Sequence, residues 1–279
     1  MSEQQPPSAG GHRTSSACGI EWSRRQLTTH EDAIASRDPM LALMAQALGY
    51  LTANVPAMLS AYALIDSSAR GWVAGPCVIK LDDATGLDPR RVYELYMANA
   101  ELDPLNNTAA STHGVPILTE VDLSDTDRAR STEFARRYLD AIGAGPSARL
   151  LLYHADRLSA TITLRRRRGD PGFTDEETGL LRGSHQFIQA VHSIAVLNAR
   201  AESHLPQFAQ THRLSPREQQ IVQQILAGAT NSQIADRLLI SPGTVTRHLN
   251  RIYAKTRVQS RTQLTALILA DQPPRPGNR

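Results

Sequence analysis

The side chains best suited to a chemical task in this sequence lie together in residues 242–256, and they suit recognition of base edges. At 100° per residue, a helix over this segment places Thr246, Arg247 and Asn250 on one polar face. Arginine can bond guanine O6 and N7 together, asparagine can bond adenine N6 and N7, and such a face fits a major groove about 12 Å wide. The alternative is an ordinary exposed helix whose polar residues face water.

The other face of this segment is apolar and must pack against neighbouring helices. It carries Val245, Leu249, Ile252 and Tyr253, which fall within one arc of the helical wheel. Ser241 precedes the segment as a start signal, since serine caps a helix N-terminus and the following proline suits the first helical position. The segment therefore predicts an amphipathic helix with its polar face outward.

Three more short helices are expected around it, each with its own start signal. The signals are Ser215 with Glu218, Thr230 with Gln233, and Ser260 with Gln263. Glycine 228 ends the first of these helices. Short helices joined by tight turns are typical of a helix-turn-helix.

The charge of the chain is concentrated in the same region. Residues 212–265 hold eight basic side chains against two acidic ones, whereas residues 1–211 have a net charge of −4. A compact basic segment on a mildly acidic body is typical of a nucleic-acid-binding module. Taken alone, the segment 242–256 would more simply be a helix whose polar residues face water. The capped helices around it and this charge distribution favour a DNA-binding helix instead.

The motifs of this region resemble the LuxR-type DNA-binding domain, without a gap over roughly 50 residues. The matching residues are Leu214-Ser215-Pro216-Arg217-Glu218, Gly228, Asn231-Ser232-Gln233-Ile234-Ala235, Leu238, Ile240-Ser241, Thr244-Val245, His248-Leu249, Ile252-Tyr253, Lys255 and Val258-Gln259-Ser260-Arg261. The resemblance covers the last fifth of the chain. It implies a bacterial transcription regulator whose recognition helix begins near Pro242.

The resemblance assigns roles to individual residues. Thr246, Arg247 and Asn250 align with the positions that read bases. The expected phosphate contacts, with Arg251 at the rim of the polar face, are Thr230, Asn231, Thr244, His248, Arg251 and Lys255. Two departures stand out: Thr246 replaces a lysine found in many members, and Thr256-Arg257 replaces the usual Leu-Gly before the last helix.

The last helix has more apolar surface than a small domain needs. Ala266, Leu269 and Ala270 lie away from the face that fills the core. In the resembled family this helix pairs two subunits on DNA, which implies a homodimer on an inverted repeat. The alternative is contact with the chain's own N-terminal domain.

The remaining two-thirds of the chain predicts an α+β domain. An antiparallel sheet is expected from strands near 58–65, 71–81, 149–154 and 158–165, with helices near 38–54, 89–100, 127–142 and from 174 onward. The order of elements resembles a GAF- or PAS-like sensor domain. The expected domains are a disordered tail 1–36, the sensor 37–203, a linker 204–212, the helix-turn-helix domain 213–271 and a flexible tail 272–279.

A sensor domain would bind a small-molecule effector among its aromatic side chains, although each of these is also an ordinary core residue. The candidate pocket residues are Tyr62, Trp72, Cys77, Tyr93, Tyr96, Phe134, Tyr138 and Tyr153. Asp103-Pro104 faintly resembles a motif of acyl-homoserine-lactone receptors. Those receptors also carry tryptophan and tyrosine residues at fixed distances from the aspartate, and this sequence has other residues there. We therefore interpret Asp103-Pro104 as a helix stop. Arg165–Arg168 is interpreted as a solvated strand end, or less simply as a second DNA contact or a clamp for an anionic ligand.

Several classes of protein are excluded or disfavoured. Neither Lys80 nor Lys255 follows a glycine, so no phosphate-binding P-loop is present. No apolar run approaches the roughly 18 residues of a membrane helix. Two cysteines make neither a disulfide framework nor a closed zinc site. We expect no enzyme, metal or cofactor, and a cytoplasmic location.

These observations predict a transcription regulator that binds double-stranded DNA as a homodimer and responds to a small molecule in its N-terminal domain. RNA polymerase is a further candidate partner. The alternative keeps the DNA-binding domain but makes the N-terminal domain a ligand-free module for protein interaction or dimerisation. An enzyme with an appended regulator domain ranks last, because no nucleophile–base signature is present.

Overall fold

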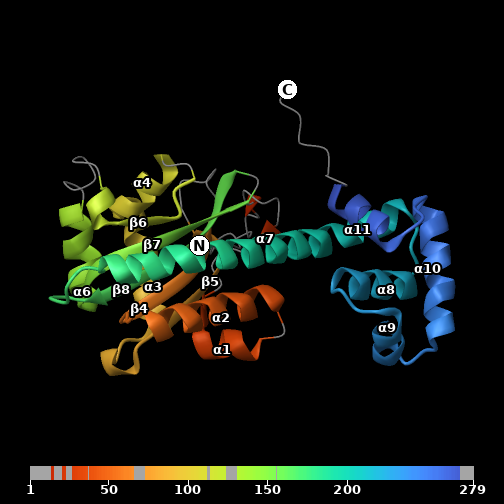
Figure 1. Cartoon of the computed structure of the whole chain (residues 1–279), viewed down its shortest axis with the longest axis horizontal. Helices are drawn as coiled ribbons and strands as arrows, with labels where there is room; N and C mark the ends of the chain where they lie inside the picture. Colours follow the sequence, from red (N-terminus) through yellow and green to blue (C-terminus); the bar gives the residue numbers. More distant parts are fainter. Residues whose placement is uncertain are drawn as a thin grey trace, which may run out of the picture. The chain divides into compact units, whose positions relative to one another are not determined.

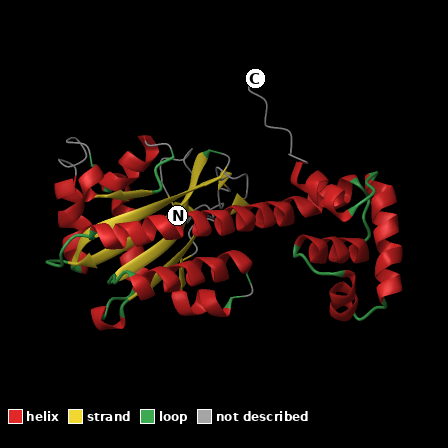
Figure 2. Cartoon of the chain, viewed as in Figure 1, coloured by secondary structure: helices red, strands yellow, loops and turns green. Residues whose placement is uncertain are grey.

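The computed structural model divides the chain into two compact units, Met1–Ser193 and Ile194–Arg279. The residues that it describes are 14–15, 21–22, 27–36, 38–65, 73–111, 114–123, 131–154 and 156–270. Figures 1 and 2 show a sheet covered by helices in the first unit and only helices in the second. The α+β class expected for the N-terminal domain and the all-α class expected for the C-terminal domain are both confirmed.

The first unit is built on a six-stranded sheet in the order β3-β5-β4-β8-β7-β6. Its strands are β3 (Leu27–Thr29), β4 (Leu59–Ile65), β5 (Val73–Leu81), β6 (Ile117–Thr119), β7 (Ala144–His154) and β8 (Arg157–Arg167). All pairs are antiparallel except β3 with β5. A separate pair joins β1 (Thr14–Ser15) to β2 (Glu21–Trp22). The four predicted strands form the centre of the sheet, and β3 and β6 add edges that the sequence did not reveal.

Strand β8 shows why the sheet needs helices on both faces. Ile162 and Leu164 alternate with Thr161 and Thr163, and the alternation predicts a strand with one solvated face. In the structure both sets are buried. The threonine face is covered because further helices pack on it.

One face of the sheet is covered by α1 (His30–Ala35), α2 (Pro39–Asn54) and part of α7 (Asp175–Thr211). Asp38 caps α2 by accepting from the backbone N–H of Met40. The Lys80 ammonium of β5 donates to Thr52 of α2 at 2.7 Å. Residues 27–35, which we predicted to belong to a disordered tail, form β3 and α1 because β3 pairs with β5.

The opposite face is covered by shorter helices. They are α3 (Pro89–Asn99), η2 (Ala100–Leu102), α4 (Pro104–Ser111), η3 (Glu120–Asp122), residues 131–134, the π-helical turn η4 (Ala135–Leu139) and α6 (Asp140–Ile142). The short helix η1 (Asp83–Thr85) lies in the connection from β5 to α3. Phe134 and Tyr138 pack with Val92 of α3 and Leu59 of β4 in one buried cluster. The predicted helix 127–142 is therefore present over its described part, with a π-helical turn inside it.

Helix α7 is much longer than its start signal alone indicates. Thr174 and Glu177 form the expected capping box, with the Thr174 backbone N–H donating to Glu177 at 2.8 Å. The helix then continues to Thr211. Residues 204–211, which we assigned to a linker, are helical because Leu205 and Phe208 belong to the buried core of the C-terminal unit.

None of the helices in the described part of the chain combines the length and apolar character needed to cross a bilayer. Among the same residues, no three His, Cys, Asp or Glu side chains are grouped to hold a metal ion.

Candidate nucleic-acid interface and N-terminal cavity

The C-terminal unit contains the four helices expected from the start signals. They are α8 (Pro216–Leu226), α9 (Asn231–Leu238), α10 (Pro242–Thr256) and α11 (Arg261–Ala270). Ser215 and Thr230 each accept a hydrogen bond from the backbone three residues later, and each capping box is complete. Ser241 caps α10 through the Thr244 backbone N–H at 3.1 Å. Local capping chemistry therefore sets where each helix begins.

Helix α10 is held by its apolar face. Val245, Leu249 and Ile252 are buried in a core shared with α8, α9, α11 and the C-terminal end of α7. Tyr253 packs partly against the same core. This arrangement is the one predicted from the helical wheel, and it leaves the other face of α10 free.

The outer face of α10 is polar and exposed. Thr246, Arg247, Asn250 and Arg251 are all exposed. The Thr246 hydroxyl donates to the Pro242 carbonyl at 3.1 Å, so it retains its capacity to accept. Within the described residues, the side chains of Arg247, Asn250 and Arg251 make no hydrogen bond or ion pair. The three groups proposed to read bases are thus solvent-facing on one helix.

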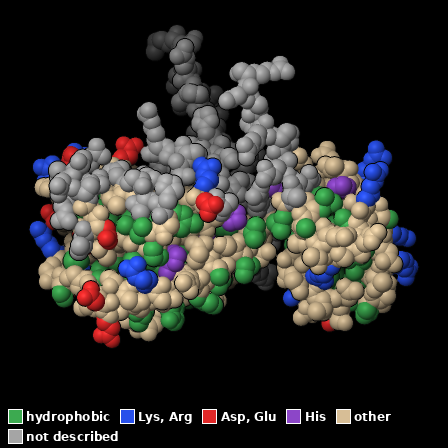
Figure 3. Space-filling view, turned by 45° about the horizontal axis from the view of Figure 1, so that its top comes forward, with side chains coloured by type: hydrophobic (Ala, Val, Ile, Leu, Met, Phe, Trp, Pro, Cys, Tyr) green, Lys and Arg blue, Asp and Glu red, His purple; other side chains and the backbone are tan. Residues whose placement is uncertain are grey.

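The basic residues of this unit fall into two sets. Arg217, Arg237, Lys255 and Arg261 are bound to groups of the unit itself; the guanidinium of Arg261, for example, donates to the carbonyls of Ile225 and Ala229. In the described structure Arg213, Arg247, Arg251 and Arg257 make no such bond and are exposed. Figure 3 shows Lys and Arg side chains, with little acidic surface, on the visible face of this unit.

The other residues expected to contact phosphates differ in their surroundings. Thr230 is exposed, and Asn231 is half-buried beside it at the start of α9. The Thr244 hydroxyl lies 2.9 Å from the Ser241 hydroxyl. His248 is half-buried on α10, and its Nδ1 is buried without a hydrogen-bond partner in the described residues.

Lys255, for which the resemblance implies a phosphate contact, also binds groups of the C-terminal unit itself. Its ammonium donates to the Glu218 carboxylate at 2.6 Å and to the Arg213 carbonyl at 3.0 Å. Burial alone would raise the pKa of Glu218, but the hydrogen bonds from Lys255 and from the Ser215 backbone hold this pKa below its usual value. Two of its three donors therefore serve the fold, and a phosphate contact of Lys255 stays a prediction.

Replacing Lys255 by alanine is expected to destabilise the C-terminal unit by about 1–2 kcal/mol, because Glu218 loses its partner while partial exposure of the pair limits the cost. The measurement is hydrogen exchange of α8 and α10 amides in the full chain. Arg251→Ala, on the same helix, is the matched control and should leave their protection unchanged. Equal protection in the Lys255→Ala protein would contradict this role.

The turn before α11 contains the second departure from the family pattern. Thr256 is buried and donates to the Ile252 carbonyl at 2.8 Å, and Arg257 adopts a left-handed conformation with φ of 57°. Arg257 therefore occupies a backbone position that glycine prefers. On α11, Ala266 is exposed and Leu269 is partly buried against the core, while the Ala270 side chain lies outside the described residues.

The first unit brings together four of the residues predicted for a ligand pocket. Cys77, Tyr93, Tyr96 and Tyr138 line a cavity of about 40 Å³ between the sheet and the helices on its second face. Phe134 lies in the cluster with Tyr138. Cys77 is buried, and burial raises the pKa of its thiol to about 12, so it is not an activated nucleophile.

The other predicted pocket residues lie elsewhere. Tyr62 is on the opposite face of the sheet, where its hydroxyl is 2.6 Å from Nδ1 of His192. The Tyr153 hydroxyl donates to the Val115 carbonyl at 3.3 Å. Trp72 lies outside the described residues. The predicted set is therefore not a single pocket.

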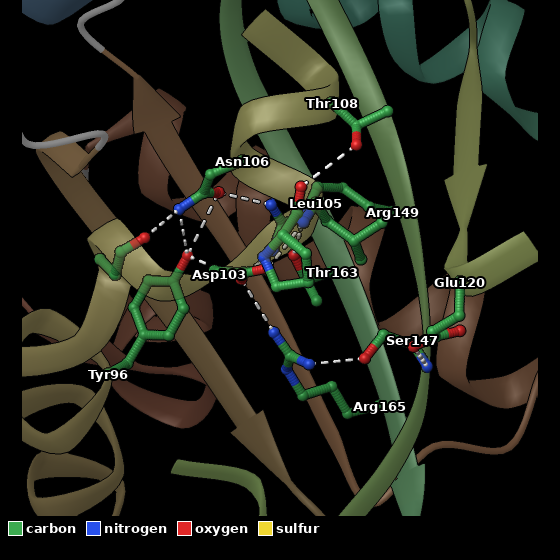
Figure 4. Close-up of polar contacts among 12 residues, drawn as sticks. Tyr96, Asp103, Leu105, Asn106, Thr108, Glu120, Ser147, Arg149, Thr163 and Arg165 are labelled. Atoms are coloured by element: carbon green, nitrogen blue, oxygen red, sulfur yellow. Dashed lines mark hydrogen bonds and ion pairs between the residues drawn. The ribbon is translucent and has the colours of Figure 1, made fainter. Parts of the chain in front are cut away.

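A buried ionic cluster lies beside the cavity (Figure 4). The Asp103 carboxylate accepts from Arg149 at 2.7 Å and from Arg165 at 3.1 Å. All three side chains are almost completely buried. Burial alone would raise the pKa of Asp103, but the two guanidiniums hold this pKa below its usual value.

Neighbouring groups complete the cluster. Arg149 also donates to Asn106 and Thr163, and Arg165 donates to Ser147. The Tyr96 hydroxyl donates to Asp103 at 3.2 Å. The Arg165 guanidinium lies over the Phe134 and Tyr138 rings, 5.4 and 5.5 Å from their centroids. Each charged group therefore has partners on the sheet or on the helices that cover it.

Two interpretations of the sequence are corrected here. Asp103 caps α4 through the Leu105 backbone N–H, but it is also the buried anion between two arginines. Arg165 and Arg166 were assigned to a solvated strand end and are buried instead, Arg166 being paired with Glu177. Only Arg167 and Arg168 of that run fit the prediction, with exposed ion pairs to Asp82 and Asp140.

Comparison with known proteins adds to this geometry. Residues 212–268 match the family described as bacterial regulatory proteins, luxR family. The monoamine regulon transcriptional regulator of Klebsiella aerogenes is 37% identical over 114 residues, which are 39% of this chain and 44% of that protein. The CsgBAC operon transcriptional regulatory protein of Escherichia coli is 33% identical over 85 residues, 30% of this chain and 38% of that protein.

The chain thus spans less than half the length of these relatives. Among solved structures, Escherichia coli SdiA aligns with a TM-score of 0.40 and 16% identity over 86% of this chain and 89% of that one. A GAF domain/HD domain protein from Geobacter sulfurreducens aligns with a TM-score of 0.38 and 14% identity, over 57% of this chain and 95% of that one. The GAF- or PAS-like type of the N-terminal domain stays a prediction.

The four capped helices and the exposed polar face of α10 agree with the family match over the same residues. The C-terminal unit of this chain is a helix-turn-helix domain of the luxR family of bacterial regulatory proteins.

Proposed function

We propose that this chain is a transcription regulator that binds double-stranded DNA through the outer face of α10. The observation that carries the proposal is the exposure of Thr246, Arg247 and Asn250 on a helix whose opposite face is buried. A helix held in this way can enter the major groove while its neighbours contact the backbone. The family of the domain supports the same function.

The exposed arginine side chains of the C-terminal unit indicate how the chain is oriented on the duplex. Arg251 flanks the base-reading residues on α10, and Arg213 and Arg257 are exposed elsewhere in the unit. We propose these three as phosphate contacts, together with the exposed start of α9 at Thr230 and Asn231. Phosphate contacts position a protein on DNA, whereas base contacts specify the sequence.

We further propose that two copies bind an inverted repeat, with recognition helices about one duplex turn apart. Ala266 of α11 is exposed and Leu269 is partly so, which leaves this helix available for the pairing implied by the family resemblance. Leu269→Asp tests that contact: it should weaken cooperative binding to a two-half-site duplex while binding to a single half-site persists.

The affinity for DNA should fall steeply with salt, because each phosphate that is neutralised releases a counterion. A dimer using three free arginines per chain makes about six phosphate contacts, and its affinity should fall about 10³-fold between 50 and 200 mM salt. Fluorescence anisotropy of the full chain on a duplex measures this slope. Affinity that is flat across the range would contradict binding through these cations.

The N-terminal domain has two candidate roles in control. The first is a small-molecule sensor with the cavity of Cys77, Tyr93, Tyr96 and Tyr138 as its site. The second is a ligand-free module that acts through protein contacts. The volume of about 40 Å³ argues against a drug-sized ligand in this particular cavity, because it holds only a few waters whereas ligand sites measure about 300–1,000 Å³.

Thermal-shift screening of the full chain against fractionated metabolites separates the two roles. A ligand that binds only the folded state at 100 times its Kd stabilises that state by about 2.7 kcal/mol. A stabilising compound whose effect is lost in Tyr96→Phe and Tyr138→Phe proteins would support the sensor role. A screen without any stabilising compound supports the ligand-free module.

A further inference from the structure

The buried ionic cluster beside the N-terminal cavity holds more positive than negative charge (Figure 4). Arg149 and Arg165 contribute two guanidiniums, which stay ionised in proteins, and Asp103 contributes one carboxylate. Each of the three residues is at most 3% exposed. One positive charge is therefore left without an anion and without access to water, which is costly in the interior of a protein.

The uncharged partners of the two guanidiniums do not remove this excess. Asn106, Thr163 and Ser147 offer amide and hydroxyl oxygens as acceptors, and two aromatic rings lie beside Arg165. These groups orient a cation, but they carry no net charge. Within the described residues Arg165 makes two hydrogen bonds, whereas its guanidinium has five N–H donors. Donors of Arg165 are thus left for another acceptor.

The other acidic groups around the cluster do not supply the missing charge. The Glu120 carboxylate accepts from a backbone N–H of β7 and makes no ion pair with Arg165 in the described structure. Burial raises the pKa values of the Tyr96 and Tyr138 phenols and of the Cys77 thiol, so all three groups are neutral near pH 7. The excess positive charge is therefore a property of the folded cluster.

The adjacent cavity has the position and the size for a small anion. Arg149 and Arg165 both line it, and none of the described residues that line it is acidic. Its volume of about 40 Å³ holds a few waters, so one anion of a few atoms fits and a drug-sized ligand does not. Opposite charges attract strongly at such a site, because little water screens them.

We propose that this cavity binds one small monovalent anion, a halide or the carboxylate of a one- or two-carbon acid, between Arg149 and Arg165. The anion balances the charge of the cluster and thereby stabilises the packing of β7 and β8 against the helices that cover them. A role in control of DNA binding rests on the proposed function, in which it narrows the sensor role to small anions. The binding itself rests on the cluster alone.

The first test is the melting temperature of the full chain at constant ionic strength. Gluconate, an anion too large for the cavity, is replaced stepwise by chloride, bromide, formate or acetate. Above its Kd the bound anion should raise the melting temperature in proportion to the logarithm of its concentration, by about 5–10 °C at 100 times Kd. The anion that acts at the lowest concentration identifies the source, halide or carboxylate.

Arg165→Met is the variant that separates this site from general salt effects. It leaves the pair of Arg149 and Asp103 electrically neutral, so the response to small anions should be lost. Arg167→Met is the matched control, because Arg167 carries the same charge on the same strand but forms an exposed ion pair, and it should keep the response. An equal response in the unmodified and Arg165→Met proteins would overturn the proposal.

A second measurement needs no variant. In bromide-soaked crystals of the unmodified chain, an anomalous peak in the cavity beside Arg165 would support a halide, and its loss on adding formate would show that carboxylates share the site. Bromide on the surface alone, with no stabilisation by formate or acetate, would overturn the proposal. A chain that binds no duplex but keeps the anion response would contradict the proposed function and leave the anion site standing.

Discussion

The Asp103→Ala protein is expected to lose about 3–5 kcal/mol of stability in its N-terminal domain. The substitution removes the only carboxylate within ion-pair distance of Arg149 and Arg165 in the described structure. Both guanidiniums are buried, so they cannot recover the lost interaction from water. Removing one partner of a buried ion pair costs far more than the pair contributes, because an uncompensated charge remains. Urea unfolding followed by Trp and Tyr fluorescence measures the change.

The pH dependence identifies Asp103 as the source. Its pKa is lowered in the folded state, so its stabilising contribution is complete above the ordinary value of about 3.9 and is lost as the pH falls below it. Asp103→Asn keeps the shape of the side chain and should abolish this acid loss. Loss of stability between about pH 6.5 and 4 comes instead from His192, because burial lowers the pKa of its imidazole to about 4.

An Asp103→Ala protein as stable as the unmodified chain, with the same loss of stability below pH 4, would show that the cluster is not needed for folding. A matched comparison is Asp82→Ala, which removes an exposed ion pair with Arg167. Exposed pairs contribute little, so this variant should change stability by less than about 1 kcal/mol.

The Arg247→Ala protein is expected to lose base preference at one position of its DNA site, at a cost of about 1–3 kcal/mol for the preferred sequence. The reason is that a bidentate bond to guanine O6 and N7 has no substitute in an alanine. Arg247 is exposed and has no partner within the described residues, so its removal should not disturb the fold. Selection from randomised duplexes, followed by anisotropy on single-substituted sites, measures the change.

Arg251→Ala is the control for Arg247→Ala because it removes the same charge one position from Asn250 on the same helix. As a phosphate contact, Arg251 should weaken binding to all sequences about equally and reduce the salt slope by about one. Uniform weakening in both proteins would show that Arg247 touches the backbone and that the base-reading face is assigned wrongly.

The C-terminal unit could be predicted closely from the sequence, and the reason is that its determinants are local. Ser215, Thr230 and Ser241 each begin a helix through a hydrogen bond to a group three residues away. The buried and exposed faces of α10 follow from helical periodicity alone. The role of Lys255 was missed because its partner Glu218 lies 37 residues away.

The interior of the N-terminal unit could not be predicted in the same way. Asp103 pairs with residues 46 and 62 positions away, so neither spacing nor composition connects them. The run of arginines 165–168 at the end of a strand was the available hint of a buried ionic cluster. The alternation of apolar and polar residues along β8, however, predicts one solvated face and does not show that helices cover both. Helix α7 shows the same limit, because its inward face mixes buried Leu181 and Ile188 with polar side chains whose hydrogen-bond partners on the sheet are distant in sequence.

The central claim is that the outer face of α10 lies in the major groove, and crosslinking tests it most directly. A photoreactive side chain at position 250 of the full chain, bound to its selected duplex, is expected to crosslink to bases inside each half-site. The same group at Gln223, exposed on α8, is the control and should give no crosslink to a base. Crosslinks to bases from position 223 and none from position 250 would contradict the account.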